Sequence, residues 1–227
     1  MDWHKSIEET GLTILSGVLR HEYLDRLQEE LNQLAPRRSR AGIRHALRLA
    51  PVAGLARHPI LADLASGVLG AAAIPFRATL FDKSPDANWS VVWHQDTALP
   101  LRERMDLPGW GPWSVKEGIP YAHAPEAALS QVLALRIHLD DSAVGNGPLR
   151  VLPGTHKLGV LTDDRIHELA TSVAPWDCVV PKGGIVAMRP LAVHASSKSQ
   201  TEMPRRVVHI EYAASASIAE PLELAVG

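Results

Sequence analysis

Cysteine is nearly absent from this 227-residue sequence, which holds one, Cys178. A single cysteine excludes an internal disulfide and the zinc sites that are built from several cysteines, and it suits a reducing compartment. The residue stands in the short run Asp177-Cys178-Val179-Val180. This run predicts a buried strand position for the thiol rather than a reactive one.

Long hydrophobic runs and blocks of one charge are also missing. No apolar stretch approaches the roughly 18 residues that a membrane-spanning helix needs. The N-terminal residues MDWHKSIEETG carry acids and lack the apolar core of an export signal. With 23 Lys and Arg against 25 Asp and Glu, the formal net charge is −2. We therefore expect a cytoplasmic protein that binds neither nucleic acid nor a membrane.

The length and the lack of internal repeats predict one domain over 1–227, large enough to bury a full core. Its first part, 1–75, is expected to be mainly helical. Leucines recur at three- and four-residue spacing in HEYLDRLQEELNQLAP, at Leu24, Leu27, Leu31 and Leu34, and Pro36 ends the pattern. A second helix is predicted from His58 to Gly70, and both helices are expected to pack on a core.

From Phe76 onward, short apolar runs are separated by Gly, Pro, Asn and Asp, which favours an antiparallel β-sandwich or barrel. The runs are FRATLF, WSVVW, QVLALRIHL, PLRVLP, CVVP, GIVAM and RRVVHIEYA. Between 100 and 125 the sequence is rich in Gly, Pro and Trp, and we predict that it is too irregular for a strand. Such a long loop in a compact domain is typical of a lid over a binding site.

His94-Gln95-Asp96 lies where the run WSVVW gives way to this lid-like segment. A mononuclear iron site needs two histidines and one carboxylate on one face of the metal, leaving the other positions open. His194, at the end of an apolar run about a hundred residues later, is the candidate for the third ligand. Because the chain has 11 histidines, a chance His-x-Asp remains an alternative for this motif alone.

A second copy, His138-Leu139-Asp140, ends a strand that runs toward the turn signal Asn146-Gly147. We expect His138 to support the pocket rather than to bind metal. In RRVVHIEY, alternation puts Arg205 and His209 on one strand face and Arg206 on the other. One arginine can therefore point inward and anchor an acidic co-substrate.

The motif HQD at 94–96, the run RIHLDDSAVGNGPLRVLPGTHK at 136–157 and the pattern HASS…PRR at 194–206 resemble the phytanoyl-CoA dioxygenase family of iron(II)- and 2-oxoglutarate-dependent oxygenases. The resemblance spans 76–213, and its block NGPLRVLPGTHK is close to diagnostic. It implies a mainly β fold with packing helices, the double-stranded β-helix or cupin-like jelly roll. The iron is then expected at the open end of the roll.

Residue by residue, the resemblance makes His94, Asp96 and His194 the ligands of Fe(II). Arg205, eleven positions after His194, takes the place of the arginine that grips the far carboxylate of 2-oxoglutarate through two hydrogen bonds. Ser196 matches a position that supports the same carboxylate. Two further positions that line the co-substrate in relatives correspond to Thr79 and Arg136, for which a strand-face threonine and a structural ion pair remain alternatives.

The segment LPGWGPWSVKEGIPYAHAP departs from the pattern of family members that act on acyl-CoA, ectoine or antibiotic precursors. Trp110, Trp113, Lys116 and Tyr121 could line a substrate pocket, or the tryptophans could pin the loop to the barrel. Arg44 could point its charge into the barrel mouth.

The resemblance implies a dioxygenase that uses O2 and 2-oxoglutarate to hydroxylate a small organic molecule, with release of succinate and CO2. Because related halogenases carry a small residue in place of the carboxylate, Asp96 favours hydroxylation. A cupin-type metal-binding isomerase or sugar-binding module and a non-catalytic ligand-binding relative stay open. The sequence decides neither the substrate nor the oligomeric state.

Overall fold

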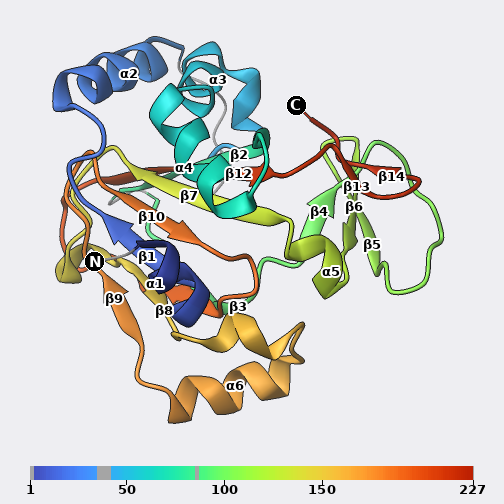
Figure 1. Ribbon diagram of the computed structural model, residues 1–227. Helices are drawn as coiled ribbons and strands as arrows, with labels where there is room; N and C mark the ends of the chain where they lie inside the picture. The colour runs from blue at the N-terminus through green and yellow to red at the C-terminus, as the bar shows by residue number, and fades with distance from the viewer. Residues whose placement is uncertain (1–2, 35–41, 85–86, 227) are drawn as a thin grey trace.

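The computed structural model describes residues 3–34, 42–84 and 87–226. Two antiparallel sheets dominate it (Figure 1), in the arrangement expected of a jelly roll. The larger sheet has the order β1-β10-β7-β12-β2, with bounds Leu12–Leu15, Ile185–Met188, Val132–His138, Arg205–Ala213 and Ile74–Lys83. The smaller sheet has the order β3-β11-β8-β9, with bounds Val91–His94, His194–Ser196, Leu149–Val151 and Trp176–Cys178.

One face of the larger sheet is apolar and lies under helices. Successive strand residues point to opposite faces, and the even positions of β2 and β12 together with the odd positions of β7 carry the apolar side chains. The buried members are Ala78, Leu80, Leu133, Leu135, Ile137, Val208, Ile210 and Tyr212. They form one core with helices α2 (His21–Leu34), α3 (Ala50–Ala56) and α4 (Pro59–Leu69), which cover this face (Figure 1).

The opposite face of the same sheet is polar although it is buried. Cross-strand register sets its side chains in rows, so that His209 is the partner of both Thr79 and Arg136. Glu211 is likewise paired with Arg77 in the neighbouring row. Burying so many polar and charged groups is costly unless they are paired or serve a ligand. This inner face therefore marks where function is expected.

The two predicted helices are confirmed as α2 and α4, and α4 ends at Gly70 in the left-handed conformation (φ 69). Leu24, Leu27 and Leu31 are buried as predicted. The expectation for Leu34 is wrong, because its side chain is 52% exposed. Helix α2 ends at this residue, so the apolar stripe stops contacting the core one turn earlier.

Several elements were not predicted. Strand β1 lies within the part expected to be helical and pairs with β10 at the edge of the larger sheet. The structure also has three further helices, α1 (Trp3–Thr10), α5 (Glu126–Leu129) and α6 (Asp163–Ser172). A separate strand pair is formed by β13 (Ser217–Ala219) and β14 (Leu222–Glu223). Three short 3-10 helices are η1 (Ala46–Arg48), η2 (Val144–Asn146) and η3 (Thr155–Leu158). Within the described ranges, no helix is both long and apolar enough to span a membrane.

The prediction for 100–125 is wrong in one respect, because the segment contains strands. β4 (Ala98–Pro100), β6 (Ile119–His123) and β5 (Trp113–Lys116) form a three-stranded sheet in that order. β5 and β6 are joined by Glu117 and Gly118, both at positive φ (52 and 83), the conformation that a tight hairpin turn requires. A glutamate rarely adopts it, and Pro120 within β6 argues against a strand, so the sequence signal was hidden.

Candidate metal centre and its cavity

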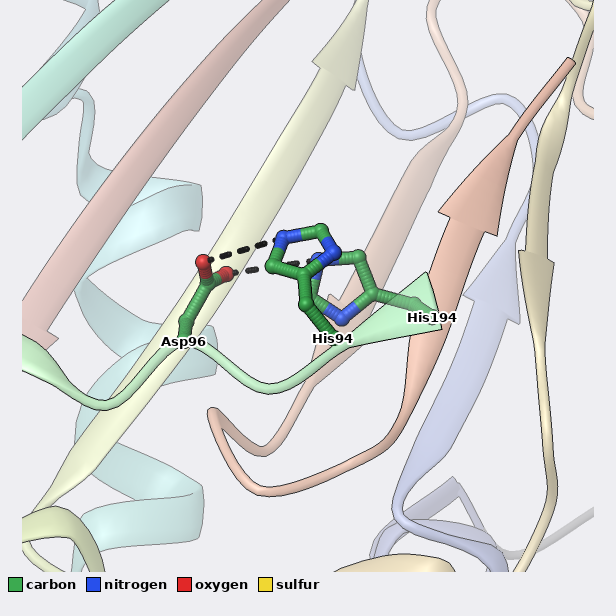
Figure 2. A group of neighbouring side chains, drawn as sticks. All are labelled: His94, Asp96 and His194. Atoms are coloured by element: carbon green, nitrogen blue, oxygen red, sulfur yellow. Dashed lines mark ion pairs between the residues drawn. The ribbon is translucent and has the colours of Figure 1, made fainter. Parts of the chain in front are cut away.

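Strand pairing brings the two candidate histidines together. His94 ends β3 and His194 begins β11, and the two residues are direct partners across the antiparallel pair. Asp96 Oδ1 lies 3.6 Å from His94 Nε2, and Asp96 Oδ2 lies 3.5 Å from His194 Nε2 (Figure 2). One ligand atom from each of the three residues lies within 4.8 Å of the others. Since two ligands about 2.1 Å from one ion can be up to about 4.2 Å apart, both measured pairs can share a metal.

Backbone contacts leave the correct nitrogen of each histidine free. His94 Nδ1 lies 2.8 Å from the carbonyl oxygen of Val92, and His194 Nδ1 lies 2.9 Å from that of Ala192. A carbonyl only accepts, so each Nδ1 carries a proton, and Nε2 is the nitrogen of each ring that can bind a metal. Two imidazoles and one carboxylate on one side of a cavity are the donor set of a non-haem iron(II) centre.

The charges at the triad also suit a cation. Burial lowers the pKa of His194 to about 4, against the opposing charge of Asp96, which keeps this imidazole neutral at pH 7. Burial would lower the pKa of His94 as well, but the hydrogen bond and charge of Asp96 outweigh it and raise that pKa. The Asp96 carboxyl has its pKa held well below its usual value, because the two histidines outweigh the effect of burial.

Gln95, between the two ligands of the motif, fixes the backbone of the turn. Its amide nitrogen donates to the carbonyls of Gly159 (2.9 Å) and Leu191 (2.8 Å), and its amide oxygen accepts from the N–H of Leu161 (2.8 Å). The N–H of Asp96 donates to the carbonyl of Pro190 at 2.9 Å. These contacts tie the motif both to the loop at 159–161 and to the chain just before His194.

A cavity of about 240 Å³ opens beside the triad and is lined by both sheets. Arg205, Ser196, Thr79 and Arg136, all predicted from the resemblance, line it. Arg205 is 3% exposed, and its Nε donates to the carbonyl of Asn146 at 3.3 Å. Arg136 donates from Nη1 to Nδ1 of His209 at 3.0 Å, while its buried Nε has no partner.

Neither of these guanidinium groups pairs with a carboxylate among the described residues. Burial and the charge of Arg136 lower the pKa of Arg205 to about 10. Burial also lowers the pKa of Arg136, which Asp96 only partly offsets. The alternative of a structural ion pair for Arg136 is therefore not met within the described chain. Two buried, uncompensated cations at this end of the cavity would be stabilised by a bound anion.

Arg206 and the second His-x-Asp lie elsewhere, as alternation predicts. Arg206 donates to Asp140 from Nε and Nη2, both at 2.8 Å, and Gln28 also donates to Asp140. Because Asp140 is held by these partners and no metal cluster among the described residues contains His138, the second copy offers no metal site. Nδ1 of His138 is buried without a hydrogen-bond partner, and burial beside Arg136 lowers its pKa to about 3.

Sequence reasoning missed several polar residues of the inner face. Lys83 is fully buried, donates to the carbonyl of Ser197 and lies over the ring of Trp89. Burial and the charges of Arg205 and Arg136 lower its pKa to about 8. The only signal was its position in the alternation of β2, four residues after Thr79.

Arg77 and Glu211 form a buried ion pair through two hydrogen bonds, and Arg77 Nη1 also donates to the carbonyl of Ala98 at 2.9 Å. Both residues line the cavity beside His209. Since Arg136 can only donate, Nδ1 of His209 accepts and its Nε2 carries the proton, 3.9 Å from Glu211. Burial raises the pKa of Glu211 despite the neighbouring guanidinium.

The residues proposed for the substrate side divide into two groups. Lys116, Tyr121 and Arg44 line the cavity. Trp110 and Trp113 do not; they pack against a second core of the three-stranded sheet, which includes Leu99 and Leu222. The tryptophans therefore pin this segment to the molecule.

Comparison with known proteins agrees with this geometry. The family model of phytanoyl-CoA dioxygenase (PhyH) matches residues 7–207. L-proline trans-4-hydroxylase of Streptomyces griseoviridis is 27% identical over 186 residues, which cover 70% of this chain and 62% of that protein. The chain thus spans less than two thirds of the length of this relative.

Solved structures share the fold. AviO1 of Streptomyces viridochromogenes superposes with a TM-score of 0.68 at 23% identity, covering 93% of each chain. EctD of S. alaskensis, crystallised with 2-oxoglutarate and 5-hydroxyectoine, gives 0.71 at 19% identity over 93% of this chain and 74% of its own. The α-ketoglutarate-dependent epimerase SnoN of nogalamycin biosynthesis gives 0.71 at 21% identity over 94% and 82%. The jelly-roll prediction is confirmed, and the chain belongs to the phytanoyl-CoA dioxygenase (PhyH) family.

Proposed function

We propose that the protein is an iron(II)- and 2-oxoglutarate-dependent dioxygenase that hydroxylates a small organic substrate. One observation supports this most strongly. A two-histidine, one-carboxylate triad and two buried arginines without carboxylate partners line the same small cavity. A metal cation at one end and a bound carboxylate at the other would compensate both sets of charges.

In the proposed reaction, 2-oxoglutarate, O2 and a substrate C–H bond give succinate, CO2 and a hydroxylated product. One oxygen atom enters the new hydroxyl and the other enters succinate. Bound iron(II) would supply the activation of O2 that no side chain can provide. His94, Asp96 and His194 would hold it, and they leave the side facing the cavity open.

The inner arginines would orient the co-substrate. Arg205 would hold the far carboxylate of 2-oxoglutarate, with the Ser196 hydroxyl beside it and Arg136 adding positive charge. A guanidinium presents two parallel N–H groups to a carboxylate, so it fixes direction as well as position. The keto acid end would then point toward the triad. Thr79, next to His209 in the cross-strand row, lines the same region.

The name of the proline hydroxylase relative supports hydroxylation as the outcome, as does the presence of Asp96. In a cupin-type isomerase Arg205 would be dispensable and 2-oxoglutarate would not bind. The presence of all three ligand residues together with Arg205 argues against a non-catalytic binding protein. In either alternative, 2-oxoglutarate is not consumed.

The test is consumption of 2-oxoglutarate by the purified, iron-loaded protein in air. We expect succinate to form slowly even without substrate, to depend on Fe(II), and to be lost in Asp96→Ala. No succinate above the level of the Asp96→Ala variant, despite full iron loading of the wild type, would contradict the proposal.

A further inference from the structure

The mouth of the cavity carries a second group of cations, distinct from the inner arginines. Lys116 lies at the end of β5, and Arg44 precedes the turn η1; both line the cavity together with Tyr121. Neither cation forms an ion pair with any described carboxylate. Arg77, also on this side, is already neutralised by Glu211.

The cavity lining holds more cationic side chains than carboxylates, and Lys116 and Arg44 belong to this excess. Among the described residues, the cavity lining has five cationic side chains, Arg44, Arg77, Lys116, Arg136 and Arg205, and two carboxylates, Asp96 and Glu211. An iron(II) ion and a 2-oxoglutarate dianion cancel one another. Three positive charges therefore remain when the proposed iron and co-substrate are bound, and the cations at the mouth have no partner.

Lys116 is held in place rather than free in solvent. Its Nζ lies 4.5 Å from the centre of the Tyr121 ring, a cation–π contact, and Tyr121 itself is 3% exposed. Burial and the charges of Arg77 and Arg44 lower the pKa of Lys116, while Asp96 and Glu211 act in the opposite direction. The ammonium is thus close enough to feel the metal-binding carboxylate. An anion bound here would relieve the repulsion among the cations.

The volume limits what this anion can belong to. About 240 Å³ is below the range of roughly 300 to 1,000 Å³ that encloses a drug-sized ligand, and 2-oxoglutarate must share the space. A substrate that is enclosed beside the metal must therefore be small.

We propose that Lys116 and Arg44 bind the carboxylate of the substrate, which is a small organic acid. This inference rests on the proposed function and names the substrate class of the same site. The carboxylate lies at the mouth, and the carbon chain points inward to the triad, between the mouth and the inner arginines. The two cationic ends of the cavity thus separate substrate from co-substrate.

The experiment uses the full chain loaded with Fe(II) and 2-oxoglutarate without oxygen, a complex that has a weak visible charge-transfer band. Small aliphatic and cyclic carboxylic acids, amino acids included, are added one at a time, each beside its primary amide. We expect some acids to perturb the band and to stimulate succinate formation in air. Their amides should bind roughly tenfold more weakly or not at all, because a charged partner is lost.

The variants Lys116→Met and Arg44→Gln should weaken binding of the same acids roughly tenfold, while the Kd for 2-oxoglutarate stays unchanged. Lys157→Met is the matched control, since Lys157 is exposed and outside the cavity lining. It should behave like the wild type in both measurements.

The inference is overturned if no acid perturbs the band, if the amides bind as well as the acids, or if the active acids compete with 2-oxoglutarate for its site. Unchanged acid binding in Lys116→Met would do the same. If the wild type forms no band at all with iron and 2-oxoglutarate, it is the proposed function that fails. The two failures are therefore distinguishable.

Discussion

Arg205 and Arg206 are neighbours in sequence with opposite surroundings, and this makes them a matched pair for mutation. Arg205 lies in the cavity without a carboxylate partner, whereas Arg206 is held by Asp140 outside it. Removing one partner of a buried charge pair costs about 2 to 5 kcal/mol, which is roughly 30-fold or more in affinity. We therefore expect Arg205→Ala to raise the Kd for 2-oxoglutarate at least roughly 30-fold. Arg206→Ala should change it little.

The free energy of unfolding should respond in the reverse order, with Arg206→Ala losing more than Arg205→Ala. Burial lowers the pKa of Arg205 from its ordinary value to about 10, a shift that corresponds to about 3 kcal/mol. Because the folded-state pKa is the lower one, the charge of Arg205 costs stability at every pH below about 10. Arg206→Ala instead loses two hydrogen bonds and leaves Asp140 half satisfied, about 1 to 3 kcal/mol. The ligand-free protein should therefore lose more stability from Arg206→Ala.

The assay is isothermal titration of the iron-loaded proteins with 2-oxoglutarate under anaerobic conditions, with urea unfolding of the ligand-free forms beside it. Circular dichroism shows that both variants are folded. A large rise in the Kd for Arg206→Ala together with a wild-type Kd for Arg205→Ala would refute the reasoning about which arginine faces the cavity.

Three further predictions concern other parts of the chain. Lys83 has a pKa of about 8, so its positive charge is present below that pH and lost above it. The Kd for 2-oxoglutarate should therefore rise roughly fivefold between pH 7 and pH 9, which is about 1 kcal/mol of binding free energy. An equal rise of the Kd in Lys83→Met would count against this role of Lys83. In urea unfolding, Leu27→Ala should lower the free energy of unfolding by about 2 to 5 kcal/mol, and Leu34→Ala should lower it by less than about 0.5 kcal/mol. Equal losses in the two variants would contradict the burial pattern. Because the hairpin of segment 100–125 lines the cavity mouth, its hydrogen-exchange protection should rise when 2-oxoglutarate and an active acid bind. Protection already maximal with metal alone, and unchanged by these ligands, would leave the lid idea unsupported.

The parts of the site that depend on a local sequence pattern could be predicted from the sequence. Strand alternation in RRVVHIEY separates Arg205 from Arg206, and the structure places them on opposite faces. His94 and His194 were each expected at the end of an apolar strand-like run. His94 does end β3, but the expectation for His194 is wrong, because this residue begins β11. The family resemblance then assigned two segments that are a hundred residues apart to one metal site.

Contacts that depend on the register between distant strands could not be predicted from the sequence. The ion pair of Arg77 and Glu211 and the close approach of Lys83 to Arg205 follow from the pairing of β2 with β12, which no local pattern determines. The β5–β6 hairpin was hidden because its turn uses Glu117 in a conformation that favours glycine. Strand β1 was missed because four residues next to a helix give too short a pattern.

The central claim is that His94, Asp96 and His194 hold one iron ion, to which 2-oxoglutarate then binds. Anaerobic titration of the protein with Fe(II) and 2-oxoglutarate tests it most directly, with metal analysis after gel filtration. We expect one iron per chain and the charge-transfer band in the wild type and in His138→Gln, a variant of the second His-x-Asp motif. We expect neither iron nor the band in His194→Ala. Full iron occupancy and an unchanged band in His194→Ala would show that the iron binds elsewhere.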